Sequence, residues 1–252
     1  MMKHILTLLF ITSYCMAYAD QPVSGYEFAT PETRAMQDDD FENPGMNAVD
    51  DGLALFQQSN SNGQSCASCH GDNGSKLNTK RIAQYPVYSE TLQSPLTLQR
   101  QVQLCWEDKL ENTPLIYGGN DAVSLETFVR FLARGEIVNV DISGPMKPYY
   151  EAGEELYNMR FGQIDMACIH CHVYHQGQRL RGQVLSQGQS NGFPEYRLGS
   201  GRITSLHRRL SECFVSFRAQ PFAFGSEELI NLEVYVNAKG NGLKIETPAV
   251  RY

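Results

Sequence analysis

The sequence predicts a mainly α protein made of two tandem domains with long loops. The prediction rests on a repeat, because Gly52 stands 14 residues before one cysteine pair and Gly153 stands 15 residues before another. Leucine and an aromatic residue follow each glycine at the same spacing, which is typical of an amphipathic helix. Later in each half, apolar residues recur at i, i+3 and i+7, beginning at Leu125 and Leu229. Neither half has many of the alternating patterns that indicate strands.

Each cysteine pair belongs to a Cys-x-x-Cys-His sequence, at residues 66–70 and 168–172. This motif attaches c-type haem, because its two thiols form thioethers with the porphyrin and its histidine binds the iron. We therefore expect two covalently bound haem c groups in two cytochrome c-like domains. The expected attachment residues are Cys66, Cys69, Cys168 and Cys171, and the expected proximal iron ligands are His70 and His172.

The first residues predict export. A basic start and an apolar run lead to Ala17-Tyr18-Ala19, which is typical of a signal-peptide cleavage site, so we expect a periplasmic protein. Cys15 as a lipoprotein cysteine is the alternative. The expected organisation is a signal peptide (1–19), an extended N-terminal arm (20–47), a first cytochrome c-like domain (48–140), a linker (141–150) and a second, catalytic cytochrome c-like domain (151–252).

Composition excludes some classes of function. The formal net charge of −7 argues against a nucleic-acid binder, and no second hydrophobic segment predicts a membrane span. Six cysteines remain after the predicted cleavage, and exported proteins usually pair such cysteines in disulfides. Here haem accounts for four of them, which leaves Cys105 and Cys213.

Cys105 and Cys213 end two segments, 98–105 and 206–213, that align without a gap. Because an iron ligand should recur in a repeat, we expect each cysteine to be the distal ligand of its haem. A disulfide between the two cysteines is one alternative, and Met146 as the distal ligand of the first haem is another.

The second haem has few other candidates for a distal ligand. No methionine follows His172. His175 is only three residues further on, and so short a loop does not reach the opposite face of a haem. His207 is a candidate, but its counterpart in the first half is Gln99.

The two halves differ in charge beside the lone cysteines. Arg209 stands four residues before Cys213, where the first half has Gln101 before Cys105. Residues i and i+4 share a helix face, so we expect Arg209 to point towards the sulfur and to hold an oxyanion there. Haem propionates, which need basic partners, are the alternative explanation for part of this charge. Around the second motif lie Arg179, Arg181, Arg197, Arg202, Arg208 and Arg209, with a single acid, Glu195.

These residues resemble SoxA, the dihaem subunit of the SoxAX cytochromes of bacterial sulfur oxidation. The likeness is clearest in four segments, and the two haem motifs and Cys105 extend it across nearly the whole mature chain. The four segments are Leu206–Cys213, Arg218–Phe222, Gly225–Glu228 and Gly240–Pro248.

The resemblance implies an L-cysteine S-thiosulfotransferase. Such a protein pairs with SoxX, a small monohaem cytochrome, and joins thiosulfate to a SoxY cysteine of the SoxYZ carrier. It implies that Cys213 is the active-site cysteine, carried as a persulfide and bound to the second iron. Arg209 would bind the substrate, and the first haem would have an accessory role. The alternatives are a dihaem electron-transfer protein without chemistry of its own and a thiosulfate dehydrogenase that forms tetrathionate.

Overall fold

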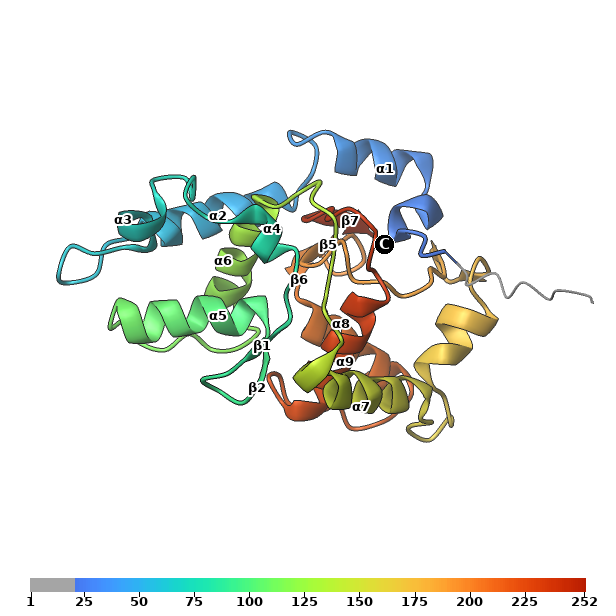
Figure 1. Ribbon diagram of the computed structural model, residues 1–252. Helices are drawn as coiled ribbons and strands as arrows, with labels where there is room; N and C mark the ends of the chain where they lie inside the picture. The colour runs from blue at the N-terminus through green and yellow to red at the C-terminus, as the bar shows by residue number, and fades with distance from the viewer. Residues whose placement is uncertain (1–20) are drawn as a thin grey trace, which may run out of the picture.

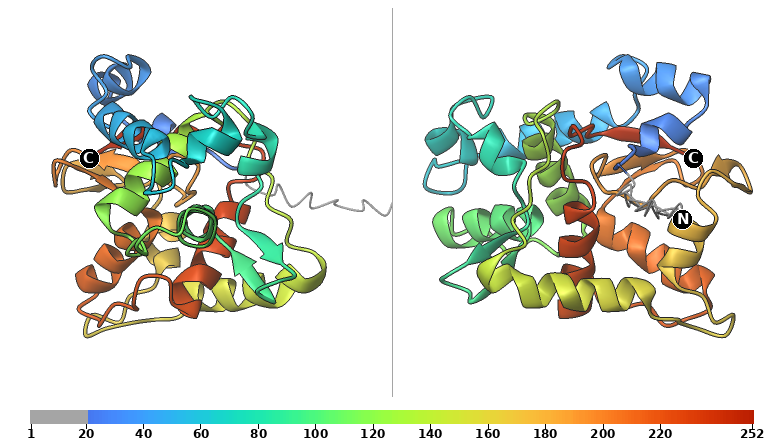
Figure 2. Two further views of the ribbon diagram at one scale, coloured as in Figure 1. Left: turned by 90° about the vertical axis from the view of Figure 1, so that its left-hand side faces the viewer. Right: turned by 45° about the vertical axis from the view of Figure 1, so that its right-hand side comes forward.

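The computed structural model describes residues 21–252, so the predicted signal peptide (1–19) lies outside the described residues. Two helical units lie side by side, each built on a packed pair of helices (Figure 1). In the first unit α2 (Met46–Gln57) packs against α6 (Asn120–Phe131). In the second unit α7 (Lys147–Asn158) packs against α9 (Glu227–Ala238), as the right-hand view of Figure 2 shows. Each pair has an apolar core of its own.

Glycine allows the close approach within each pair. A β-carbon on Gly52 would overlap the carbonyl oxygen of Ser124, and one on Gly153 would overlap that of Asn231. The equivalence of Ser124 and Asn231 fixes the alignment of the two helices. Leu125 therefore corresponds to Leu232 in the repeat, although Leu125 and Leu229 are the residues that begin the two apolar patterns.

The elements between the paired helices also repeat. The first haem motif forms the short helix α3 (Cys66–His70), and the second runs into a π-helical turn, η4 (His170–Tyr174). Each aligned cysteine segment is helical and begins at a capping residue, Thr97 or Ser205, whose side chain accepts a backbone N–H of the first turn. The remaining helical elements of this part are α4 (Thr79–Ile82), α5 (Leu98–Leu104), the π-helical turn η2 (Cys105–Lys109) that continues α5, and α8 (Leu206–Ser216).

Short strands accompany the helices. An antiparallel hairpin precedes α5 and another precedes α8, and β7 joins the second hairpin in parallel. Strands of two or three residues are too short to show an alternating pattern, which is why the sequence did not predict them. They are β1 (Val87–Ser89), β2 (Ser94–Leu96), β3 (Arg179–Leu180), β4 (Gln183–Val184), β5 (Glu195–Arg197), β6 (Arg202–Thr204) and β7 (Ala249–Arg251).

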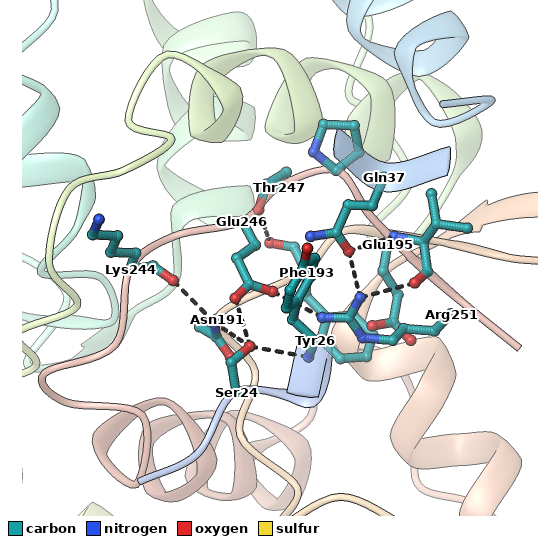
Figure 3. Close-up of polar contacts among 12 residues, drawn as sticks. Ser24, Tyr26, Gln37, Asn191, Phe193, Glu195, Lys244, Glu246, Thr247 and Arg251 are labelled. Atoms are coloured by element: carbon teal, nitrogen blue, oxygen red, sulfur yellow. Dashed lines mark hydrogen bonds and ion pairs between the residues drawn. The ribbon is translucent and has the colours of Figure 1, made fainter. Parts of the chain in front are cut away.

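The N-terminal segment that we expected as an extended arm contains the turn η1 (Gly25–Phe28) and the helix α1 (Pro31–Asp38). Proline at the first helical position and the Thr30 cap explain where α1 begins. The segment is tied to the end of the chain, because Ser24 donates to Glu246 (2.6 Å) and Gln37 accepts from the Arg251 guanidinium (Figure 3).

The predicted linker 141–150 contains the turn η3 (Gly144–Met146) and the first four residues of α7. Across residues 21–252, none of the helices has the combination of length and apolar character that a membrane span requires.

We predict that Gly153→Ala destabilises the protein by about 3 kcal/mol, because the added methyl group would force α7 away from α9. Urea unfolding of the haem-loaded protein measures this. Gly199→Ala is the matched control, since nothing lies within 4 Å of a β-carbon there. Equal stability of the two variants would contradict the close packing of α7 on α9.

Candidate haem sites and an anion-binding arginine

The first site is an apolar cavity of about 220 Å³ that Cys66, His70 and Cys105 line together. Burial, and then the nearby Cys105, raise the pKa of the Cys66 thiol to about 11. The cavity therefore brings together one attachment cysteine, the motif histidine and the lone cysteine that the repeat singled out. Its other walls are Phe56, Leu77, Asn78, Arg81, Ile82, Tyr85, Leu98, Gln101, Val102, Leu125 and Val129.

Gln101 and Cys105 share a face of α5, as the spacing predicted. The Gln101 Nε2 atom donates to the Cys105 Sγ atom at 3.2 Å. A neutral amide therefore stands beside this sulfur. The same helical spacing applies to α8, where the chain has Arg209 and Cys213.

The second site gathers Cys168, Cys171 and Cys213. Cys168 is buried, and burial followed by the nearby Cys213 raises its pKa to about 12. The same two causes raise the pKa of Cys171. The sulfur on α8 therefore lies close to both attachment cysteines of the second motif.

The hydrogen bond that His172 makes through Nδ1 orients its Nε2 atom for binding a metal. Its Nδ1 atom lies 2.9 Å from the carbonyl oxygen of Ser186, which leaves Nε2 for an iron. Burial lowers the pKa of His172, and the positive charges of Arg209 and Lys239 lower it further. The neutral imidazole that ligation requires is thus favoured. Gly188 leaves room for the ring, because a β-carbon there would lie 2.8 Å from it.

Beside the second motif is a polar cavity of about 380 Å³. His172 and Arg209 line it, together with Arg179, Arg197 and Arg251. Three of the six predicted arginines, Arg179, Arg197 and Arg209, thus line the cavity, and the other three do not. Arg202 pairs with Glu212 at 3.8 Å, Arg208 lies over the Phe224 ring at 5.4 Å, and Arg181 is exposed away from the cavity.

Two of the lining charges already have partners. The Arg197 Nη1 atom lies 2.9 Å from Glu195, and Arg251 lies 2.8 Å from Glu246. Arg209 has a looser partner, Glu212, at 3.5 Å. Cys213 is the largest cause that raises the pKa of Arg209, so the sulfur lies within electrostatic range of the guanidinium on the same helix. Arg209 is therefore the cation of this cavity best placed to hold an anion beside Cys213.

Within residues 21–252, the structure argues against three alternatives for the lone cysteines and the iron ligands: the disulfide, Met146 and His175. None of the six cysteines of residues 21–252 forms a disulfide, so Cys105 and Cys213 are not paired with each other. Met146 lies outside the first cavity and lines a separate groove near β1. His175 is exposed on the loop after η4.

His207 is also unavailable as a ligand. Its side chain is 2 % exposed, its Nδ1 atom accepts the backbone N–H of Gly225 (3.1 Å), and its Nε2 atom lies 3.0 Å from Glu233. Nδ1 is thus occupied, and Nε2 faces the Glu233 carboxylate, although no aligned hydrogen bond joins them among residues 21–252.

Two contributors to the second site were not found from the sequence. Lys239, at the end of α9, places its ammonium group 4.7 Å from the centre of the Tyr157 ring, and burial lowers its pKa. The N-terminal segment supplies Phe28 and Thr33 to the wall of the polar cavity. No spacing in the sequence connects either contribution with residues 168–172.

Two helical units, each with a haem-attachment motif set against a cysteine-bearing helix, define c-type cytochrome domains. Residues 51–138 and 152–245 each match the family model described as SoxA/TsdA, cytochrome c domain. The chain belongs to this family, and covalently bound haem c follows from membership.

Relatives extend the likeness over nearly the whole chain. The L-cysteine S-thiosulfotransferase subunit SoxA of Pseudaminobacter salicylatoxidans is 40% identical, over 92% of this chain and 82% of its own length. The corresponding subunit of Rhodovulum sulfidophilum is 37% identical, over 92% and 81%. The crystal structure of SoxXA from P. pantotrophus superposes with a TM-score of 0.84 and 34% identity, over 92% of this chain and 87% of that one. The resemblance to SoxA that the sequence predicted is thereby confirmed.

We predict that Gly188→Ala disturbs the ligation of a haem by His172, because the new methyl group would press on the imidazole ring. The absorption and EPR spectra of the purified cytochrome should then contain a second iron population. Gly177→Ala is the matched control, since Gly177 has a similar positive φ (77° against 82°) and nothing within 4 Å of a β-carbon. Identical spectra for the two variants would argue against His172 as a ligand.

Proposed function

We propose that the chain is the dihaem SoxA-type subunit of an L-cysteine S-thiosulfotransferase. It couples thiosulfate oxidatively to a cysteine of a SoxY-type carrier protein, together with a SoxX-like monohaem cytochrome. The relatives that share 37–40% of its sequence carry this activity in their names. The observation that carries the proposal is the placement of Arg209 next to Cys213, beside the cavity that His172 lines.

The proposal includes two haem c groups. Cys66 and Cys69 would hold the first by thioether bonds, with His70 and Cys105 as its iron ligands. The apolar lining of the first cavity fits a porphyrin. Cys168 and Cys171 would hold the second, with the iron ligands His172 and Cys213. The hydrogen bond between His172 and the Ser186 carbonyl supports this assignment.

Arg209 binds the substrate. Thiosulfate is a small dianion, and a guanidinium can offer it two parallel N–H donors. Glu212 is the present partner of Arg209, at 3.5 Å and on a partly exposed surface, so the incoming anion competes with a weak ion pair. Binding through the sulfonate oxygens would leave the sulfane sulfur directed at Cys213.

Cys213 carries the sulfur chemistry as a persulfide. Its outer sulfur forms a bond with the sulfane sulfur of thiosulfate, and this oxidation releases two electrons. The thiolate of the carrier then attacks the sulfane sulfur, and the bond between this sulfur and the outer sulfur of the persulfide breaks. The carrier keeps the S–SO₃ group, and the persulfide remains on Cys213. Each bound haem would accept one electron, so the coupling needs a second acceptor besides the second haem, and the haem of the SoxX-like partner would be the exit for these electrons.

The first haem has an accessory role in this proposal. Gln101 stands where the second unit has Arg209, and it donates to Cys105. A neutral amide offers no charge to an anion, so substrate binding at the first site is not expected. The partner proteins, export to the periplasm and the catalytic role of the second unit belong to the same proposal.

A thiosulfate dehydrogenase is the second candidate, because the family model covers both SoxA and TsdA domains. Its product, tetrathionate, is a free small molecule and needs no carrier protein. Product analysis with and without the SoxYZ-type carrier distinguishes the two activities. Tetrathionate formed equally in both reactions would overturn our proposal.

We predict that Arg209→Ala lowers the coupling of thiosulfate to the carrier by about 10- to 100-fold, because a charge-assisted hydrogen bond to the substrate is lost. Both haems should remain attached. Arg208→Ala is the control, since it removes the same charge from the same helix but acts away from the cavity. Turnover measured with the SoxX-like partner and the carrier decides, and equal rates for the two variants would remove Arg209 from the substrate site.

Intact-mass analysis should find two haem groups and one additional sulfur atom on the mature protein. Cys168→Ala combined with Cys171→Ala should retain one haem, because the first motif is separate from the second. Treatment with a thiol reductant should remove the additional sulfur from the wild-type protein. A mass without that sulfur in untreated protein would contradict the persulfide.

A further inference from the structure

Gln99 and His207 occupy equivalent positions in the first turns of α5 and α8, and both are buried. Gln99 accepts the N–H of Gly118 (2.6 Å) and donates to Glu126 (2.6 Å). His207 accepts the N–H of Gly225 through Nδ1 (3.1 Å), and its Nε2 lies 3.0 Å from Glu233. The amide and the imidazole thus both accept a glycine N–H and both face a carboxylate. Gln99 donates to its carboxylate, whereas among residues 21–252 His207 Nε2 lies close to Glu233 without an aligned hydrogen bond.

The hydrogen bond from Gly225 determines the form of the imidazole. Because Nδ1 accepts an N–H, it carries no proton, and the ring proton is on Nε2, facing Glu233. His207 therefore presents an acceptor at Nδ1 and a donor at Nε2, as a carboxamide presents one of each. Glutamine at this position would reproduce both contacts.

Side chains of each unit contact the other unit near these residues. Tyr117 of the first unit stacks on the His207 ring, with 5.0 Å between the ring centres. In the reverse direction, Phe224 of the second unit covers Gly118, where a β-carbon would overlap the Phe224 ring. His207 thus contacts both its own unit and the neighbouring one.

The carboxylates of this interface face each other around one cation. Glu126 and Glu233 line a small internal space together with Arg130, which is 5 % exposed. Within the described part of the chain, Nε and one Nη of Arg130 have no hydrogen-bond partner. Desolvation, and then the nearby Glu233, raise the pKa of Glu126 to about 8. Arg130 therefore lies close to both carboxylates.

The helical geometry connects this interface with the second site. The buried residues of α8 are His207 and Phe214, seven positions apart on one face. Arg209 and Cys213 lie on the opposite face, about 200° and 240° around the axis from His207. A rotation of α8 about its own axis would therefore turn Arg209 away from the cavity directly.

We propose that His207 is a positioning residue that fixes the rotation of α8 through Glu233 and Gly225, and thereby directs Arg209 and Cys213 towards the second site. Its effect on turnover rests on the function proposed above, but its effect on α8 does not. An apolar side chain could fill the same volume and would still leave Glu233 and the Gly225 N–H without partners.

The test compares His207→Leu with His207→Gln in the haem-loaded protein. We expect His207→Leu to speed hydrogen exchange of the α8 amides and to lower kcat/KM for thiosulfate coupling by about tenfold or more, since small misplacements of binding groups are costly. His207→Gln should restore slow exchange and keep kcat/KM within about threefold of the wild type, because both contacts are retained. His207→Phe, which keeps a ring against Tyr117 but neither contact, replaces the leucine variant if that one does not fold.

Gln99→Leu is the matched control in the first unit. It should speed exchange in α5 and leave thiosulfate coupling within about threefold of the wild type, because α5 carries no substrate residue. Wild-type exchange in α8 of His207→Leu would overturn the proposal, as would a glutamine variant as impaired as the leucine variant. Equal loss of coupling in Gln99→Leu would also overturn it, since the effect would then be a general loosening. If the wild-type protein itself fails to couple thiosulfate, the proposed function fails, while the exchange of α8 still decides the role of His207.

Discussion

The contact of two helices at a glycine is the constraint on which each unit depends. Gly52 on α2 and Gly153 on α7 allow two helices to approach until backbone meets backbone. The motif that follows each of these helices is then held at a fixed distance from the C-terminal helix of the same unit. Into the remaining space, α5 or α8 places its cysteine. The crossing therefore sets the size of the space in which a macrocycle, a histidine and a sulfur meet.

One scaffold thus supports two different sites, and two of the differences between them are single side chains on the cysteine-bearing helices. At the position four residues before the cysteine, an amide in the first unit corresponds to a guanidinium in the second. At the buried position in the first helical turn, glutamine corresponds to histidine with its contacts retained. The first of these differences changes the charge beside the sulfur, and the second does not. If the proposed function holds, duplication followed by a change of charge at one position accounts for an accessory site and a substrate site in one chain.

The sequence predicted what depends on covalent chemistry and on local helical periodicity. The two Cys-x-x-Cys-His motifs, the pairing of Cys105 with the first cavity and the proximity of Arg209 to Cys213 need only spacing rules within one segment. The register of α6 relative to α9 could not be predicted, because apolar residues at i, i+3 and i+7 fit a helix in more than one register. The close contacts of glycine, which define the register, are tertiary.

The remaining features depend on contacts between distant segments, which periodicity does not encode. Lys239 reaches the second site from the end of α9, and its place against Tyr157 follows only from the packing of α7 on α9. The arm expected to be extended forms α1, because Thr30 and Pro31 start a helix whose one buried residue, Gln37, contacts β7. The positive charge that the sequence predicted around the second motif is reduced by local ion pairs. One of them joins Arg197 to Glu195, two residues apart on a strand.

The parallel pairing of β7 with β5 has a practical consequence for work with the recombinant protein. It brings Tyr252 to the rim of the polar cavity, next to Gly182 and within reach of the arm that covers it. A purification tag joined after Tyr252 would begin beside the cavity in which, on the proposed function, thiosulfate binds. A tag placed there would obstruct substrate access, and a polyhistidine sequence in particular would bring extra imidazoles close to a haem site.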